Sequence, residues 1–303
     1  ILAQPNCAHH LAWLDTLNLL STVLPELTAC RGVVQSPPHH LDVFDHTLRV
    51  VHHAEHLLAA LGLRLRMPSG NSRLYPLPIS LQPWRTALCA TMSEAVGGGH
   101  AQADLLIWSA LAHDWGKAQT QTFEPDGRIR FLGHDLISAQ KATERLTTLR
   151  VSKDEVRTVT ETVRNHMRPG FLANGGIPSR RARYRFFRDV GAVVVPVLLL
   201  ELADFLGVHG PHLTEEGWRQ RLVFVALMLG DWFTEPALVR PRPLVNGHDL
   251  MHALQMEPGP EVGTLLAAIQ EAQAVGEIST RDEALAWARR WRMHPSQEDN
   301  GSA

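Results

Sequence analysis

The stretch Ala110-Leu-Ala-His-Asp-Trp-Gly-Lys117 ends an apolar run with an imidazole and a carboxylate side by side, at His113 and Asp114. Comparable side chains recur elsewhere in the chain, each inside or beside an apolar pattern with helical spacing: His46, His134, His166 and Asp204. Imidazole and carboxylate groups that packed helices bring together are typical ligands of a divalent metal ion. Such a site makes water nucleophilic towards phosphate esters. The stretch therefore predicts a helical fold built around a metal centre.

Helical periodicity continues through most of the chain of 303 residues. Apolar residues recur three and four apart in segment after segment, and the alternating runs typical of strands are rare. Ser152 with Glu155, and Thr280 with Glu283, have the spacing of a helix capping box. The turn sequence Pro125-Asp-Gly-Arg128 has short flanks that predict a small hairpin. We expect an all-α fold in which a helical bundle is followed by a small helical tail.

The boundaries of these parts follow from breaks in the pattern. Two prolines in the segment Arg240 to Asn246 mark the clearest boundary. We predict a helical neck at residues 1–36, the main domain at 37–238, the small tail at 239–294 and disorder at 295–303.

The composition is that of an ordinary soluble globular protein, with 45% hydrophobic and 20% charged residues. A net charge of −2 gives no global field for nucleic acid, so any RNA contact requires a local basic patch. Three widely separated cysteines fit a reducing cytoplasm. The most apolar run, Val190 to Val208, is interrupted by Pro196, Glu201 and Asp204, so we expect a buried helix and no membrane contact.

The six candidate ligands fall into two groups. His46, His113, Asp114 and Asp204 are expected to hold a first ion, because a buried Asp204 without a partner is costly. His134 and His166 are expected either to complete a second ion site or to position phosphate. The ligand types suit Mg, Mn, Ni, Co, Fe or Zn. The alternative that an individual histidine binds no metal is also open. The chain has 17 histidines, and most of them, His39 included, are expected to be surface or structural.

Gly116 and Lys117, which follow the His113-Asp114 doublet, have expected roles of their own. Lys117 lies one helical turn past His113 and is a natural partner for a phosphate oxygen, so Asp114 and Lys117 are assigned as catalytic residues. Gly116 is expected to let the backbone turn at this point.

A second candidate surface is the basic segment from Ser179 to Arg188, in which arginines interleave with Tyr184, Phe186 and Phe187. Such a helix could hold a phosphate backbone while the aromatic rings anchor it. The alternative is an amphipathic helix with a solvated arginine face. The residues assigned to RNA or phosphate binding are Arg168, Arg180, Arg181, Arg183 and Arg185.

The order His46, His113-Asp114, Asp204 resembles the H…HD…D signature of the HD superfamily of metal-dependent phosphohydrolases. The block Ala112-His-Asp-Trp-Gly-Lys117 is similar to the central motif of that family, with Trp115 where a small aliphatic residue is usual. The resemblance implies an all-α HD-domain bundle at residues 37–238 and a divalent metal cofactor. Trp115 is expected to narrow or cap the site.

Further motifs are similar to the body and tail of bacterial tRNA nucleotidyltransferases (CCA-adding enzymes) and poly(A) polymerases. They are Pro37-Pro-His-His-Leu-Asp-Val-Phe-Asp-His-Thr-Leu48, Phe131-Leu-Gly-His134, Val163-Arg-Asn-His-Met-Arg-Pro169 and the segments from Pro243 to Leu250 and Gly276 to Leu285. Nothing in the chain resembles the polymerase head of that family, so the resemblance does not imply nucleotide addition by this chain.

Two functional hypotheses remain. The first is a phosphatase or phosphodiesterase that acts on nucleotides or on RNA-terminal phosphate esters, such as 2′,3′-cyclic ends. The second is a tRNA-binding body whose HD site is structural or vestigial and whose partner is a separate nucleotidyltransferase head. The basic helix and the tail favour the second, and the intact set of six candidate ligands favours the first.

Overall fold

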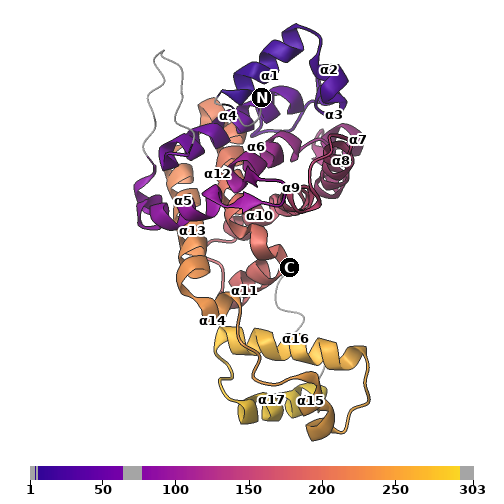
Figure 1. The fold of residues 1–303 in the computed structure, drawn as a ribbon, viewed down its shortest axis with the longest axis vertical. Coiled ribbons are helices and arrows are strands. Elements are labelled where there is room, and N and C mark those ends of the chain that lie inside the picture. Colours follow the sequence, from indigo (N-terminus) through magenta and orange to yellow (C-terminus); the bar gives the residue numbers. More distant parts are fainter. Residues whose placement is uncertain (1–3, 5, 64–76, 294–303) are drawn as a thin grey trace. The chain divides into compact units, whose positions relative to one another are not determined.

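The computed structural model describes residue 4 and residues 6–63 and 77–293. Among these residues the fold is helical, and its strands are four short segments paired in two hairpins (Figure 1). The expectation of an all-α fold is thereby confirmed. The segment 295–303, for which disorder was predicted, lies outside the described residues.

The chain divides into two compact units. The first comprises residues 1–177 and 190–229, and the second comprises residues 178–189 and 230–303. The basic segment around 180–188 thus belongs to the second unit, together with the tail. The predicted boundaries at 36/37 and 238/239 stay predictions.

The first unit begins with three helices, α1 (Cys7–Thr16), α2 (Leu20–Val23) and α3 (Pro25–Thr28), followed by the long helix α4 (Val43–Leu61). The carboxylate of Glu55, buried in the middle of α4, accepts hydrogen bonds from the backbone N–H groups of Cys7 at 2.7 Å and Ala8 at 3.3 Å. These are N–H groups of the first turn of α1, which has no helical partners for them. A residue of α4 therefore caps α1.

The bundle around α4 forms the core of the first unit. Helix α12 (Val194–His209) packs against α4, α6 (Gln102–Ala112) and α9 (Lys153–Asn165), and α8 (His134–Thr148) packs against α9. Shorter elements of this unit are η1 (Ile79–Trp84), α5 (Arg85–Ser93), α7 (Lys117–Thr120), α10 (Met167–Asn174), η2 (Gly191–Val193) and η3 (Gly210–His212). Most residues of α12 are buried, as expected for the apolar run.

Composition alone leaves one membrane-span candidate in the described residues, the stretch Arg180–His212. In its most apolar window, 72% of the residues lie inside the protein. Such burial is typical of a core helix.

The two hairpins are small. Strands β1 (Ala95–Val96) and β2 (His100–Ala101) pair with each other, as do β3 (Gln121–Phe123) and β4 (Ile129–Phe131). The second pair confirms the hairpin predicted around Pro125-Asp-Gly-Arg128. Its strand β4 is fixed to the preceding chain by Ser36, whose Oγ accepts a hydrogen bond of 2.7 Å from the backbone N–H of Ile129.

Both predicted capping boxes are present. The Ser152 hydroxyl accepts from the backbone N–H of Glu155, and the Glu155 carboxylate accepts from the N–H of Ser152 at 3.0 Å. Thr280 and Glu283 make the same reciprocal pair at the start of α17 (Arg281–Met293). These caps fix where the two helices begin.

The second unit contains α11 (Arg180–Val190), α14 (Pro236–Val239), α15 (Gly247–Leu254), α16 (Pro260–Val275) and α17. Helix α13 (Glu215–Thr234) runs from the first unit into it. The three helices α15, α16 and α17 pack on one another around a small core that includes Leu250, Leu265, Ile269 and Leu285. This tail therefore has a hydrophobic core of its own.

Candidate metal centre and pocket

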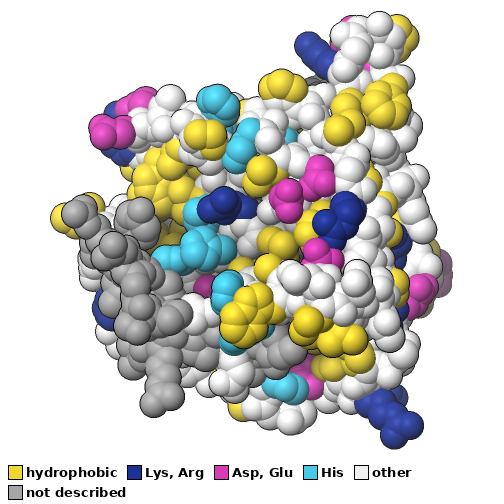
Figure 2. All heavy atoms as spheres, turned by 90° about the horizontal axis from the view of Figure 1, so that it is seen from above, with side chains coloured by type: hydrophobic (Ala, Val, Ile, Leu, Met, Phe, Trp, Pro, Cys, Tyr) yellow, Lys and Arg dark blue, Asp and Glu magenta, His cyan; other side chains and the backbone are white. Residues whose placement is uncertain are grey.

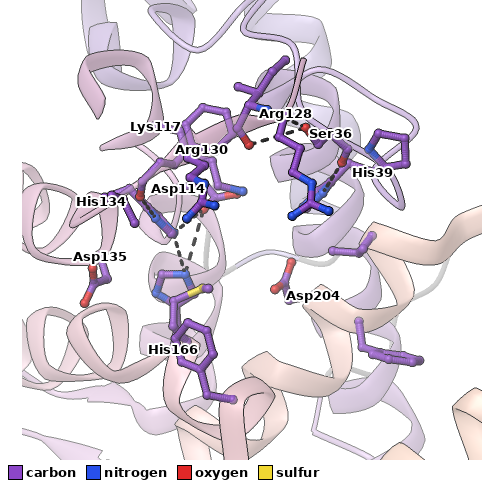
Figure 3. A pocket seen from close by; sticks show the side chains of 18 of the residues that line it. Ser36, His39, Asp114, Lys117, Arg128, Arg130, His134, Asp135, His166 and Asp204 are labelled. Atoms are coloured by element: carbon purple, nitrogen blue, oxygen red, sulfur yellow. Dashed lines mark hydrogen bonds and ion pairs between the residues drawn. The ribbon is translucent and has the colours of Figure 1, made fainter. Parts of the chain in front are cut away.

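All six predicted ligands lie together in the first unit, although they come from five separated parts of the chain. His46 lies on α4 and Asp204 on α12. His113 is the residue after α6, and Asp114 follows it. His134 is the first residue of α8, and His166 lies between α9 and α10. Figure 3 shows Asp114 on one side of the pocket with His134 and His166, and Asp204 across from them.

The first half of the cluster consists of His46, His113 and Asp204. The Oδ1 atom of Asp204 lies 3.0 Å from Nε2 of His46 and 3.7 Å from Nε2 of His113. Donor atoms that share one ion at bonds of roughly 2.1 Å stand roughly 3 to 4 Å apart. The spacing of these three side chains is therefore that of a cation site.

The second half consists of Asp114, His134 and His166. The Oδ1 atom of Asp114 lies 3.3 Å from Nε2 of His134 and 3.9 Å from Nε2 of His166. Its other oxygen, Oδ2, lies 3.4 Å from Nε2 of His46 and 3.2 Å from Nε2 of His113. One carboxylate thus presents an oxygen to each half of the cluster.

Three of the imidazoles are oriented by backbone carbonyls. The Nδ1–H groups of His113, His134 and His166 face the carbonyl oxygens of Ala110 at 2.8 Å, Phe131 at 2.8 Å and Val163 at 2.6 Å, which sets this tautomer. In each ring the Nε2 atom is then directed at the cluster. This is the arrangement by which proteins hold a histidine ready for a metal ion.

The residues present fit a divalent metal. Nε2 of His46, Nε2 of His113, Oδ1 of Asp114 and Oδ1 of Asp204 are buried and accept or donate no hydrogen bond within the protein. Buried polar atoms without such partners are rare and costly. Their convergence on one space is explained by a cation that they coordinate.

The charges around the cluster also favour a cation. Burial alone would lower the pKa of His113, but the carboxylates of Asp114 and Asp204 raise it to about 10. Burial would likewise raise the pKa of Asp114, yet His113 and Lys117 hold it well below its usual range. In His166, by contrast, burial lowers the pKa to about 3, helped by His134 and His113. The two carboxylates therefore stay ionised and attract positive charge.

Lys117 is a direct neighbour of the cluster. Its Nζ lies 2.8 Å from Oδ2 of Asp114 and donates a hydrogen bond of 2.7 Å to Oε1 of Gln35. Its side chain is buried but borders the pocket. The structure thus shows Lys117 as the ion-pair partner of Asp114, and its contact with phosphate stays a prediction.

The expected role of Gly116 is wrong. Its backbone angles, φ −72° and ψ −23°, are those of an ordinary right-handed helix, so no glycine-specific turn occurs there. A Cβ on Gly116 would lie 2.2 Å from the carbonyl oxygen of His134 and 2.9 Å from the amide nitrogen of Ser138. The residue is needed because the first turn of α8 approaches it closely. The left-handed backbone angle occurs instead at Gly133, whose φ of +74° turns the chain from β4 into α8.

Trp115 also departs from expectation. The side chain is fully buried in the core, and it does not border the pocket. It therefore does not cap the site, and its effect on the centre comes through packing.

Four residues of the cluster, Asp114, His134, His166 and Asp204, form the floor of a cavity of about 1030 Å³. Sequence reasoning missed several residues that line it, because they are brought there only by the tertiary fold: Ser36, His39, Arg128, Arg130, Phe171, Glu201 and Arg221. The one signal for His39 was its place seven residues before His46. Its ring centre lies 5.4 Å from that of His46, and burial, with Lys117 and His46, lowers its pKa to about 4. His39 is thus a neutral wall residue, not a stray surface histidine.

One wall holds a buried ion pair. Nη1 of Arg221 lies 2.6 Å from Oε1 of Glu201, and its guanidinium stands 4.5 Å from the ring centre of Phe205. Burial raises the pKa of Glu201 to about 8, against the lowering effect of Arg221. This wall adds a cation beside the cluster.

Other histidines lie apart from the cluster. Figure 2 shows histidine side chains at several places on one face of the molecule, among exposed hydrophobic residues. His9 and His40 are exposed. Both are among the histidines expected to be surface or structural.

The arginines assigned to RNA contact lie elsewhere. Arg180, Arg181, Arg183 and Arg185 belong to the second unit and pair there with its own groups. Arg181 lies 2.6 Å from Glu277, Arg185 lies 2.7 Å from Glu271 and Arg183 lies 2.5 Å from Asp231. Arg168 is an exposed residue of α10 in the first unit and does not border the pocket. Phosphate binding by these five residues stays a prediction.

A comparison with known protein families identifies the family of the chain. The family model described as HD domain matches residues 43–204, which is more than half of the chain. The chain belongs to the HD domain family. The matched range begins at the start of α4 and ends at Asp204, so it encloses every residue of the cluster. A second model, tRNA nucleotidyltransferase domain 2, matches residues 238–288, after the HD domain.

The relatives of this HD-domain chain are tRNA nucleotidyltransferases. It is 32% identical to the A-adding tRNA nucleotidyltransferase of Deinococcus radiodurans over 294 residues, covering 96% of this chain and 56% of that protein. It is 32% identical to the CC-adding tRNA nucleotidyltransferase of Thermus thermophilus over 307 residues, covering 100% of this chain and 57% of that protein. The resemblance read from the motifs is thus confirmed. The chain spans about half the length of these relatives.

Proposed function

We propose that this chain is the tRNA-binding part of a nucleotidyltransferase that completes tRNA ends, with an HD domain followed by a small tail. The observation that carries the proposal is the similarity to an A-adding and a CC-adding enzyme along nearly the whole chain. The match of the tail to tRNA nucleotidyltransferase domain 2 supports it independently. A nucleotidyltransferase head is the expected partner, and the free cysteines accord with the cytoplasm.

In this proposal, helix α11 supplies phosphate contacts. The side chains of Arg180, Arg181 and Arg185 are one third to two fifths exposed although each is paired. Their carboxylate partners hold the guanidinium groups in place, and an incoming phosphate can share them. Arg183, which is more buried beside Asp231, fixes the helix within its unit.

Replacing Arg180, Arg181 and Arg185 together with glutamine is expected to weaken tRNA binding. Each phosphate contact releases counterions from the RNA on binding. Losing one contact therefore lowers the steepness of log binding constant against log salt concentration by roughly 0.7 to 0.9 per arginine. The measurement is a filter-binding or anisotropy titration at several salt concentrations. Arg219, an exposed arginine paired with Glu216 on α13, is the matched control. An unchanged slope in the triple variant would contradict the assignment of α11.

A second function is favoured by a separate observation, the convergence of six candidate ligands, five of them buried, beside a cavity that four of them line. We propose that the HD site hydrolyses phosphate esters of nucleotides or RNA ends. Two divalent ions held by the two halves of the cluster would polarise the ester and activate water.

The chain's own residues would act around that chemistry. Asp114 joins the two halves, because it directs one oxygen to each. The backbone carbonyls of Ala110, Phe131 and Val163 keep three imidazoles in the ligating tautomer. Lys117, held by Gln35, presents positive charge to a phosphate oxygen at the same floor. The depth of the cluster excludes bulk water from most of the ligands, which strengthens these charge interactions.

Hydrolysis is expected to depend wholly on divalent metal. A chelator should abolish the opening of 2′,3′-cyclic nucleotides to monophosphates and the release of phosphate from nucleoside monophosphates or a 3′-phosphorylated tRNA end. One of the added ions Mg, Mn, Ni, Co, Fe or Zn should restore this hydrolysis. The measurement is a substrate panel read together with the metal content of the purified chain. Full turnover in the chelator, or no turnover with any ion, would refute this second function while leaving tRNA binding untouched.

A further inference from the structure

The rim of the HD pocket carries cationic and aromatic side chains that the cluster does not use. Arg128 and Arg130 stand on the β3–β4 hairpin, and Phe171 stands on α10. All three border the cavity that is also lined by four of the candidate metal ligands. Figure 3 shows Arg128 and Arg130 in the upper part of this pocket.

The two arginines are available to an anion. Their side chains are 72% and 50% exposed, and their acidic neighbours, Asp126 and Glu124, lie 3.4 and 3.7 Å away. Exposed pairs of this kind contribute little, so a phosphate can displace them. Arg128 comes directly before strand β4 and Arg130 lies within it, so one short segment brings two cationic side chains to the same cavity.

The hairpin holds the arginines in a fixed place relative to the cluster. Ser36 bonds the backbone N–H of Ile129, the residue between them, at 2.7 Å. The carbonyl of Phe131, the next residue after Arg130, accepts from Nδ1 of the ligand His134 at 2.8 Å. The rim is thus built into the same structure that orients a metal ligand.

Phe171 offers a face for a base. Its ring is 69% exposed, which is unusual for a phenylalanine on a helix that borders a cavity. Exposed aromatic rings beside cationic groups are the stacking platforms of proteins that bind single-stranded nucleic acid. The cavity, at about 1030 Å³, stands at the upper end of the range of roughly 300–1,000 Å³ for sites of drug-sized ligands. It has room for more than one nucleotide.

We propose that Arg128, Arg130 and Phe171 form a subsite for the nucleotide next to the reacting phosphate ester, so that the HD pocket prefers the end of a single-stranded polynucleotide to a free mononucleotide. The inference rests on the proposed hydrolysis at the HD site. The arginines contact the phosphates that follow the reacting one, and the Phe171 ring stacks on a base.

Binding of a fluorescent short oligoadenylate with a 3′-phosphate, measured in chelator so that nothing is hydrolysed, tests the subsite directly. The double variant Arg128→Gln, Arg130→Gln should lower the slope of log K against log salt by roughly 1.4. Phe171→Ala should weaken binding roughly tenfold. With metal present, both variants should lower the ratio of kcat/KM for the oligonucleotide to that for adenosine 3′-monophosphate.

The chain offers matched controls. Phe123 lies on the β3–β4 hairpin that carries the two arginines. Its side chain is 69% exposed, as is that of Phe171, and it does not border the cavity. Arg157 on α9 is 74% exposed and paired with Asp154, and it too lies outside the cavity. Phe123→Ala and Arg157→Gln should leave binding and the kcat/KM ratio unchanged.

The outcomes separate this inference from the function beneath it. Equal effects in rim and control variants, or equal affinity of the unaltered chain for the oligonucleotide and the mononucleotide, would overturn the subsite. Weakened oligonucleotide binding in the rim variants, without hydrolysis of any substrate, would support the subsite and refute the hydrolysis.

Discussion

Replacing Asp114 with asparagine is expected to remove metal from both halves of the HD cluster and to lower phosphate-ester hydrolysis by more than about 100-fold. The reason is that Asp114 directs one oxygen to each half, 3.2 Å from Nε2 of His113 and 3.3 Å from Nε2 of His134. Changes in groups that only orient ligands already cost roughly 10- to 100-fold in metal affinity or activity. The metal content per chain and the turnover of the best substrate are the measurements.

A change in fold must be separated from a loss of metal. Asp114→Asn leaves the buried Lys117 without its carboxylate, and breaking a buried pair costs roughly 3–5 kcal/mol. The double variant Asp114→Asn, Lys117→Met should therefore recover thermal stability without recovering metal. Asp135→Asn is the matched control, because Asp135 borders the pocket beside His134 but makes no part of the cluster. Unchanged metal content in Asp114→Asn would sink the assignment.

Replacing Gly116 with alanine is expected to destabilise the first unit and to displace His134. The new Cβ would meet the carbonyl oxygen of His134 at 2.2 Å, and both close contacts are backbone atoms that cannot rotate away. Overpacking of this kind costs roughly 1–3 kcal/mol and occasionally more, so the melting temperature should fall by about 5 °C or more. Metal held by Asp114, His134 and His166 should weaken as well.

The matched control for this variant is Gly175→Ala in the same unit. Gly175 has a φ of −83°. A Cβ added there would have the carbonyl oxygen of Leu172 as its nearest neighbour, at 3.9 Å, which is an ordinary van der Waals distance. Stability should therefore stay the same or rise slightly, because alanine lowers the entropy of the unfolded chain. Equal melting temperatures of Gly116→Ala and the unaltered chain would show that α8 can move away without cost.

The parts of the structure that sequence could predict are those written in local pattern. Helical spacing, the two capping boxes and the turn between β3 and β4 each depend on residues close in the chain. The six ligands could be gathered because the order of His46, His113-Asp114 and Asp204 resembles a family, not because spacing alone places them together.

The remainder depends on contacts between distant segments. Nothing near Arg128 or Phe171 in the sequence marks them as neighbours of one cavity. Gly116 is required by the close approach of a helix that starts 18 residues later. No neighbour of Trp115 in the sequence indicates that its side chain lies in the core and not at the pocket. The arginines of α11 pair with carboxylates up to 96 residues away, and no local pattern reveals that.

The cap that Glu55 provides to α1 has a consequence for local motion. The first turn of a helix usually frays, and its amide protons exchange quickly with solvent. Here the amide of Cys7 is bonded to a carboxylate buried on another helix. Opening this end would strip a buried charge of hydrogen bonds, so exchange at Cys7 should require a larger opening that involves α4. The beginning of α1 is thus one of the slowly exchanging parts of the first unit.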